Sequence, residues 1–231
     1  RQDRGHRAAH RGAGAGVISE RGTIGGDGPP LAAEILRPDA GTPLAGVVVC
    51  HPHPMYGGTR ESHVVRALGK AIVAERMAAL VFDFRGAGES AGESMADHTA
   101  WMDAVRALDI LEDARPPGTP LAICGSSFGA WVALHVGAMD PRVRAVAAVA
   151  PGASLPSDMG ERPVCVAHPE HDHITPVQTI ADWMASVGGG ELAVVHGADH
   201  YLQAEAGDVS RQIAGFLARA LAGWSPLESG A

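Results

Sequence analysis

The chain has 231 residues, of which 46% are hydrophobic and 19% charged, and its formal net charge is −8. This composition is that of an ordinary globular protein that is long enough to bury a sizeable core. The acidic balance argues against a nucleic-acid partner, and no segment reaches the roughly 20 continuous apolar residues that cross a membrane.

The first 16 residues differ from the rest of the chain. They are rich in Arg, Gly, His and Ala and show no apolar period. We therefore expect a disordered tail, or a remnant added by cloning, at residues 1–16. A single domain is expected over residues 17–231.

From residue 17 onward, short runs rich in Val, Ile and Ala alternate with longer helical patterns. Eight runs are predicted to be strands, at residues 17–24, 31–36, 46–51, 79–84, 120–124, 144–149, 163–168 and 191–196. Helical patterns lie at about 60–76, 97–114, 127–139, 176–187 and 208–222. The later strands are nearly all apolar, which is typical of parallel strands covered on both faces. The alternation predicts an α/β fold with a doubly wound, mostly parallel sheet.

The connection between two of the late strands is short. Only about a dozen residues separate the run that ends near Val149 from the run that begins at Pro163. Many enzymes of this layout insert a cap domain at that point, and here there is no room for one. We therefore expect an open and shallow site without a cap domain.

The strongest motif is Gly125-Ser126-Ser127-Phe128-Gly129, which follows an apolar strand and opens a helix. It fits the G-x-S-x-G nucleophile elbow, which requires this strand–turn–helix context. The middle residue of the elbow occupies a strained turn that exposes its hydroxyl. A side chain at either flanking glycine would collide with the neighbouring strand or helix. The register selects Ser127 rather than Ser126 as nucleophile, and a chance Gly/Ser turn is the alternative.

Three other stretches accompany the elbow. They are HPHP at 51–54 with YGGT at 56–59, FDFRGAGES at 82–90, and GADH at 197–200. Together with the elbow they make the chain resemble the α/β-hydrolase superfamily, in particular its small lidless bacterial members, over about residues 31–222. The resemblance implies a serine esterase that works through an acyl-enzyme and needs neither cofactor nor metal. Asp83 and Arg85, in the second stretch, are expected to be structural.

The resemblance also implies the base of a catalytic triad. On this fold the triad members follow one another as serine, acid and histidine. His200 lies in the loop after the last predicted strand, where the family places the base that takes the proton of Ser127. His196 is the nearest rival, but it falls within the strand.

The acid is expected after the strand at 163–168. The family pattern, strand–x–x–Asp–x–x–Pro, maps best onto Asp172 and Pro176, with one extra residue before the proline. Asp172 would hold the tautomer of the catalytic imidazole and stabilise its charged form. Glu170 is the alternative, whereas Asp199 is poorly placed because it directly precedes His200.

An oxyanion hole needs two N–H donors. One is expected to be the backbone N–H of Phe128, directly after the nucleophile. By analogy with the family the second is assigned to His53, and the prolines on both sides of it support this because they cannot donate. Met55 and Tyr56 are candidates for substrate binding at the mouth of the pocket, with simple packing as the alternative.

A second hypothesis is that the protein is a metal-dependent hydrolase. His51 and His53 form an H-x-H pair, and such residues can bind zinc. A later cluster contains His168, His171, Asp172 and His173. The proline between the first two histidines restricts their geometry, and this reading leaves the elbow without a purpose.

Other questions stay open at this level. The same machinery would cleave thioesters, amides or lactones, and an open site favours short acyl chains. A non-catalytic binding protein of the same fold is a third class, although all three triad candidates are present. A homodimer through an edge strand or the apolar surface near Met55 is conceivable.

The number and position of the cysteines indicate the redox state of the compartment in which the protein works. Cys50, Cys124 and Cys165 each lie within or at the end of a short apolar run. An odd number of buried thiols is typical of a reducing environment rather than of a disulfide framework. We expect a cytoplasmic protein, because no apolar signal region is visible, although the missing initiator methionine leaves open a removed upstream segment.

Overall fold

The computed structural model describes residues 8–11, 16–94, 99–222 and 224. The strands are β1 (Ala8–Arg11), β2 (Val17–Ile24), β3 (Leu31–Pro38), β4 (Gly46–Cys50), β5 (Ala78–Phe82), β6 (Leu121–Ser126), β7 (Val143–Val149), β8 (Val164–Pro169) and β9 (Glu191–Val195). The helices are α1 (His63–Ala74), α2 (Thr99–Ala114), α3 (Phe128–Met139), α4 (Val177–Ser186) and α5 (Ala206–Leu221), with a short 3-10 helix, η1 (Pro54–Tyr56). All the strands and helices expected from the sequence are present, and only their ends are shifted.

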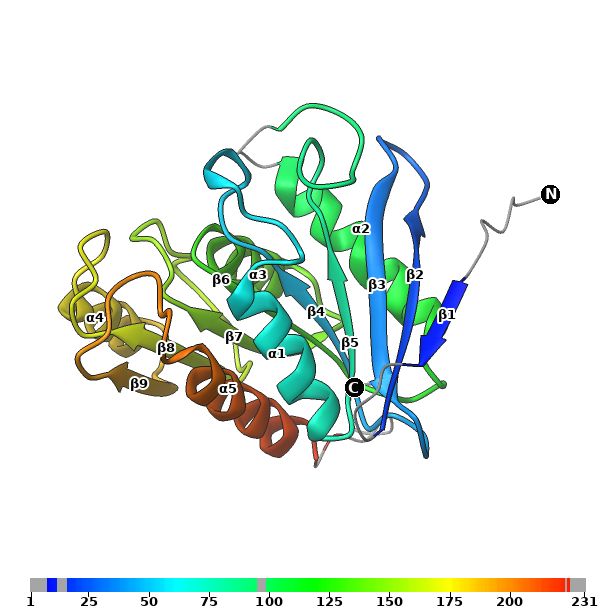
Figure 1. Cartoon of the computed structure of the whole chain (residues 1–231). Coiled ribbons are helices and arrows are strands. Elements are labelled where there is room, and N and C mark those ends of the chain that lie inside the picture. Colours follow the sequence, from blue (N-terminus) through cyan, green and yellow to red (C-terminus); the bar gives the residue numbers. More distant parts are fainter. Residues whose placement is uncertain (1–7, 12–15, 95–98, 223, 225–231) are drawn as a thin grey trace.

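The strands form one sheet in the order β1-β2-β3-β5-β4-β6-β7-β8-β9 (Figure 1). Strands β1, β2, β3 and β5 pair antiparallel, and every pair from β5 to β9 is parallel. This is the predicted α/β-hydrolase architecture, a mostly parallel sheet with helices on both faces. The sheet is one strand larger than expected because β1 adds to its edge.

Strand β1 differs from the expectation of a disordered tail. Residues 8–11 pair antiparallel with β2, from Ala8 opposite Arg21 to Arg11 opposite Ile18. Backbone pairing needs only the free N–H and C=O groups of an edge strand, so an apolar period is not required. The rest of the expected tail, apart from residue 16, lies outside the described residues.

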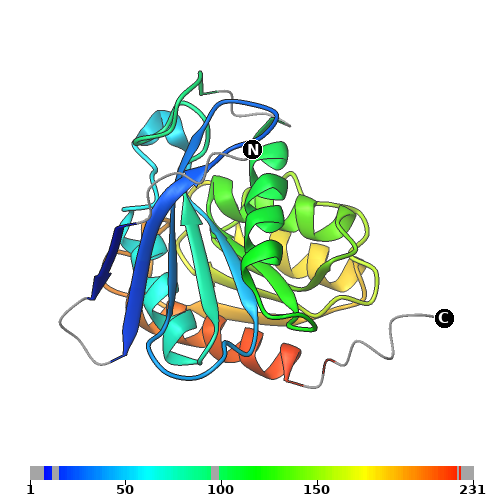
Figure 2. The same ribbon diagram turned by 90° about the vertical axis from the view of Figure 1, so that its right-hand side faces the viewer.

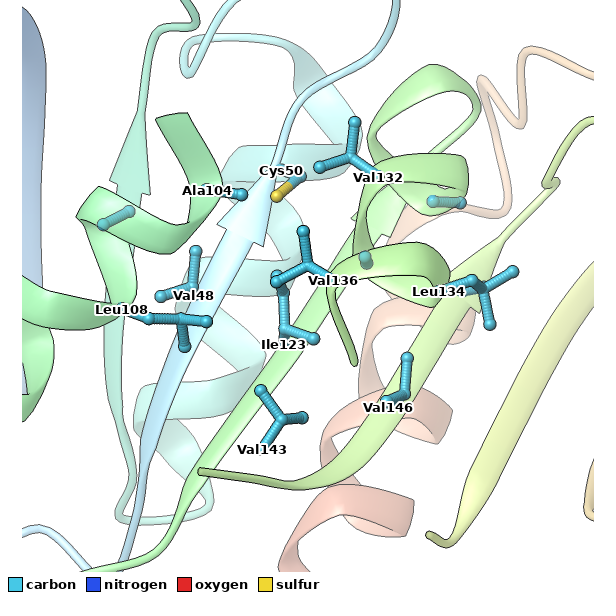
Figure 3. Packing of buried hydrophobic residues seen from close by; sticks show 14 of the residues in the cluster. Val48, Cys50, Ala104, Leu108, Ile123, Val132, Leu134, Val136, Val143 and Val146 are labelled. Carbon is cyan, nitrogen blue, oxygen red and sulfur yellow. The ribbon is translucent and has the colours of Figure 1, made fainter. Parts of the chain in front are cut away.

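The two faces of the sheet carry separate cores. In β4, Val48 and Cys50 pack toward α2 and α3, whereas Val47 and Val49 pack toward α1 and α5. Figure 3 shows the first of these cores, where Val48 lies beside side chains of the neighbouring strand and helices. Figure 2 looks toward the antiparallel edge and shows α2 on one side of the sheet and α1 and α5 on the other. Covering both faces explains why the central strands are almost wholly apolar.

The carboxyl ends of the parallel strands meet at one edge of the sheet. The loops after β4, β6, β8 and β9 all begin there, so residues far apart in the sequence come together. Between β7 and β8, residues 150–163 form no helix or strand. This connection is fastened to the domain by the Trp183 indole N–H, which donates to the Pro156 carbonyl at 2.7 Å. It contains no cap domain, as the short spacing predicted.

Candidate active site

Ser127 occupies a strained turn between β6 and α3. Its φ of 54° and ψ of −116° are unusual for a residue with a side chain. The turn is held by the Ser127 N–H, which donates to the Val149 carbonyl at 2.8 Å. A Cβ at Gly125 would lie 2.2 Å from the Gly129 oxygen, and one at Gly129 would lie 2.2 Å from the Cys50 oxygen. Both glycines are therefore required for the close approach of helix and strands.

A chain of hydrogen bonds links Ser127, His200 and Asp172. The distance from Ser127 Oγ to His200 Nε2 is 2.9 Å, and that from His200 Nδ1 to Asp172 Oδ2 is 2.7 Å. Because a carboxylate only accepts, the imidazole carries its hydrogen on Nδ1 and leaves Nε2 to accept from the serine hydroxyl. The structure thus brings together all three residues selected from the sequence, in the arrangement that activates a serine.

The Asp172 carboxylate is held by its own loop. Its Oδ1 accepts hydrogen bonds from the N–H groups of Ile174 and Thr175, at 2.8 and 3.1 Å. Burial by itself raises the pKa of Asp172. The hydrogen bonds from His200 and from these two backbone donors lower the pKa by more than burial raises it, so the pKa lies below its usual value. Asp172 is therefore ionised at neutral pH.

The rival residues hold the neighbouring loop. Glu170 accepts the Gly197 N–H at 2.9 Å and lies 3.3 Å from the Nδ1 of His196. Asp199 accepts the N–H of Tyr201 at 2.9 Å. These contacts shape the turn after β9, on which the candidate base is carried.

The two expected oxyanion donors lie on adjoining elements. The rings of His53 and Phe128 have centroids 5.0 Å apart. Among the described residues, neither backbone N–H has a hydrogen-bond acceptor. The carbonyl of His53 accepts from the N–H groups of Tyr56 and Gly58, both at 3.1 Å, so its loop is tightly turned. Two unused N–H groups, one directly after Ser127 and one on a loop that contacts Phe128, are what an oxyanion hole requires.

The candidate pocket residues are highly exposed. Met55 is 73% and Tyr56 89% exposed, so they do not simply pack against the core. Two further large apolar side chains, Ile174 and Tyr201, are also more than half exposed in the loops of the triad acid and base. These four residues form what we call the apolar rim.

Sequence reasoning missed an aromatic row beside the nucleophile. The Phe128 ring stacks on Trp131 with centroids 5.5 Å apart, and Trp131 lies 5.3 Å from Trp101 of α2. Trp101 in turn stacks on His135, at 5.0 Å. The sequence spacing of Phe128, Trp131 and His135 indicates that they share one face of a helix, but it does not indicate that Trp101 of α2 packs against them.

The turn after β5 is structural, as expected. Asp83 is 1% exposed and accepts the N–H groups of Arg60 and Glu89, at 2.7 and 3.1 Å, together with the Arg60 guanidinium. Arg85 pairs with the buried Asp103 carboxylate at 2.7 Å. These ion pairs tie the turn after β5 to the loop before α1 and to α2.

The alternative of a metal-dependent hydrolase requires a set of side chains that could bind the metal together. No group of three or more His, Cys, Asp or Glu residues among those described could hold a metal ion. Both ring nitrogens of His51 are engaged with backbone groups, at 2.6 and 3.0 Å.

The helices of the described residues are too short or too polar to span a membrane.

Buried neutral His51 makes stability dependent on pH. Burial lowers its pKa from 6.5 to about 4. As the pH falls from about 6.5 to 4, the His51 side chain therefore becomes protonated in the unfolded chain but stays neutral in the folded one. The free energy of unfolding falls by about 3 kcal/mol over this range. The pKa of Asp172 lies below 3.8, so its own contribution is lost only at lower pH.

We expect His51→Asn to reduce this loss, because asparagine does not titrate in that range. The free energy of unfolding, measured in urea at pH 7 and pH 4.5, should fall less in the variant than in the parent. Equal losses in the two proteins would show that His51 is not the group responsible.

Comparisons with known proteins show the family and the fold that the chain resembles. Residues 41–162 match the family model described as serine aminopeptidase, S33 (Hydrolase_4). An uncharacterized protein of Rickettsia prowazekii is 27% identical over 198 residues, covering 80% of this chain and 82% of that protein. A structure of an alpha-beta serine hydrolase homologue from Coxiella burnetii has a TM-score of 0.78 at 26% identity and covers 86% of this chain and 97% of that one. A serine hydrolase without lid from Xanthomonas campestris gives 0.74 at 26% identity, covering 90% and 95%.

Proposed function

Since the chain belongs to the serine aminopeptidase S33 (Hydrolase_4) family and has the α/β-hydrolase fold, we propose that it cleaves carboxylic esters through an acyl-enzyme. The observation that carries this proposal is the continuous hydrogen-bond chain from Ser127 through His200 to Asp172. The strained turn at the serine supports it, because backbone strain of this kind concentrates at functional positions.

The proposed reaction follows from the protons in this chain. His200 Nε2 takes the proton of Ser127 as Oγ attacks the ester carbonyl. The N–H groups of Phe128 and His53 stabilise the resulting oxyanion. His200 then gives the proton to the departing alcohol, and a water molecule, activated by the same imidazole, hydrolyses the acyl-enzyme. Throughout, the Asp172 carboxylate holds the imidazole and stabilises its charged form.

The apolar rim favours an uncharged ester over a peptide with a free amino terminus. Met55 and Tyr56 offer no charge to bind an ammonium group, and their exposed side chains can contact an acyl or alkyl group. The short connection between β7 and β8 provides no cap to cover a long acyl chain. We therefore propose short acyl groups as the preferred substrates.

A matched substrate series tests this proposal. p-Nitrophenyl esters from acetyl to dodecanoyl should show the highest kcat/KM at the short end. Thioesters and p-nitroanilides with the same acyl groups, and simple lactones, should be turned over more slowly. A strong preference for long acyl chains would contradict the proposed acyl preference, and faster cleavage of an aminoacyl anilide than of its ester would indicate a peptidase.

The cysteines support a proposed cytoplasmic location. Cys50, Cys124 and Cys165 are free and buried. Burial raises the pKa of the Cys124 and Cys165 thiols to about 12, which suppresses the reactive thiolate. Thiols of this kind suit a reducing compartment, where no disulfide is needed.

A further inference from the structure

His51 is a buried imidazole with both ring nitrogens engaged. Its Nε2 lies 3.0 Å from the backbone nitrogen of Phe84, and its Nδ1 lies 2.6 Å from the carbonyl oxygen of Pro52. The Phe84 N–H can only donate, so Nε2 must accept. The imidazole hydrogen therefore sits on Nδ1 and is donated to the Pro52 carbonyl.

The Pro52 carbonyl shares a peptide unit with the His53 N–H. A peptide is planar, and in its trans form the C=O and N–H point in opposite directions. The described residues contain no cis peptide. A contact that fixes the Pro52 oxygen on one side therefore fixes the His53 N–H on the other side.

We propose that His51 is a positioning residue that aims the His53 N–H at the oxyanion by holding the Pro52 carbonyl. This inference rests on the proposed function, in which that N–H stabilises the developing charge. The ring of Pro52 fixes its φ but not its ψ, so the peptide can still turn by rotation about that bond and about the φ of His53. Without the imidazole, a turned peptide would direct a carbonyl oxygen at the oxyanion, which is repulsive.

Two glycines place this peptide beside the nucleophile. A Cβ at Gly58 would lie 2.1 Å from the Pro52 oxygen, so that segment packs directly on the same peptide. A Cβ at Gly129 would lie 2.5 Å from the His51 oxygen, which brings the start of α3 onto the same loop. The other proposed oxyanion donor, the N–H of Phe128, belongs to the residue directly before that glycine. The two contacts thus place the peptide that His51 holds next to the start of α3, directly after the nucleophile.

The chain offers a matched pair of substitutions. The amide nitrogen of asparagine can occupy the place of Nδ1, so His51→Asn keeps a donor for the Pro52 carbonyl. The amide oxygen of glutamine can occupy the place of Nε2, so His51→Gln keeps an acceptor for the Phe84 N–H but loses the donor. Both remove the ring from the core, and a purely structural role would affect them alike.

Steady-state kinetics with p-nitrophenyl acetate test the inference. We expect His51→Gln to lose about 10²–10³-fold in kcat with little change in KM, the loss typical of a missing oxyanion donor. His51→Asn should recover most of that kcat. Equal kcat values in two variants that melt cooperatively would overturn the inference.

A second measurement needs no variant. The ¹⁵N shifts of His51 in the parent protein report which ring nitrogen carries the hydrogen, and we expect it on Nδ1. A hydrogen on Nε2 would overturn the inference even if the glutamine variant failed to fold. A parent without esterase activity would overturn the proposed function itself, and activity with equal variants would overturn only the role of His51.

Discussion

Ser127→Ala is expected to lower ester hydrolysis by at least about 10⁴-fold while leaving the fold intact. The hydroxyl is the group that bonds to the carbonyl carbon, and alanine offers no replacement. The turn at φ 54° is equally strained with alanine, since both residues carry a Cβ. Thermal melting should therefore stay close to that of the parent. Turnover of p-nitrophenyl acetate, followed at 405 nm, gives the loss.

Ser126→Ala is the matched control for this substitution. Ser126 is the last residue of β6 and lies opposite Val149 in the sheet, so its hydroxyl is not presented by the turn. We expect kcat/KM within a few-fold of the parent. Loss of activity in Ser126→Ala together with retention in Ser127→Ala would place the nucleophile one residue earlier and contradict the elbow register.

Asp172→Asn is expected to lower kcat by roughly 10³–10⁴-fold. The N–H groups of Ile174 and Thr175 donate to Oδ1, so an asparagine oxygen would stay with them. The amide nitrogen would then point at His200 Nδ1, which would have to accept. The imidazole hydrogen would move to Nε2, where it faces Ser127 and blocks proton removal.

Glu170→Gln is the control for the acid. Its carboxylate accepts the Gly197 N–H and lies near His196, and a glutamine oxygen can still accept the first of these. We expect kcat within a few-fold of the parent in this variant. A large loss in Glu170→Gln with a small one in Asp172→Asn would make Glu170 the acid and contradict the assignment.

The sequence was most informative where a local pattern determines the geometry. The elbow combines a strand, a turn and two close-packed glycines within five residues, so Ser127 could be selected from its neighbours alone. Asp172 and His200 were assigned instead from the resemblance to the α/β-hydrolase superfamily, which places the acid and the base in the loops after two late strands. The structure places both within hydrogen-bonding distance of the expected partners.

The remaining features depend on contacts between distant segments. His51 bonds to the N–H of Phe84, 33 residues along the chain, and nothing in the pattern around it announces this partner. The aromatic row needs Trp101 of α2 against Trp131 of α3, which only the packing of two helices decides. Strand β1 forms through backbone pairing with β2, which side-chain periodicity does not encode.

Covalent labelling with a fluorophosphonate tests the central claim most directly, because only an activated serine reacts with it. Intact-mass analysis of the parent, Ser127→Ala and Ser126→Ala should show one adduct in the parent and in Ser126→Ala, and none in Ser127→Ala. That result would establish Ser127 as the activated nucleophile. A parent that stays unlabelled, or an adduct that persists in Ser127→Ala, would contradict the account.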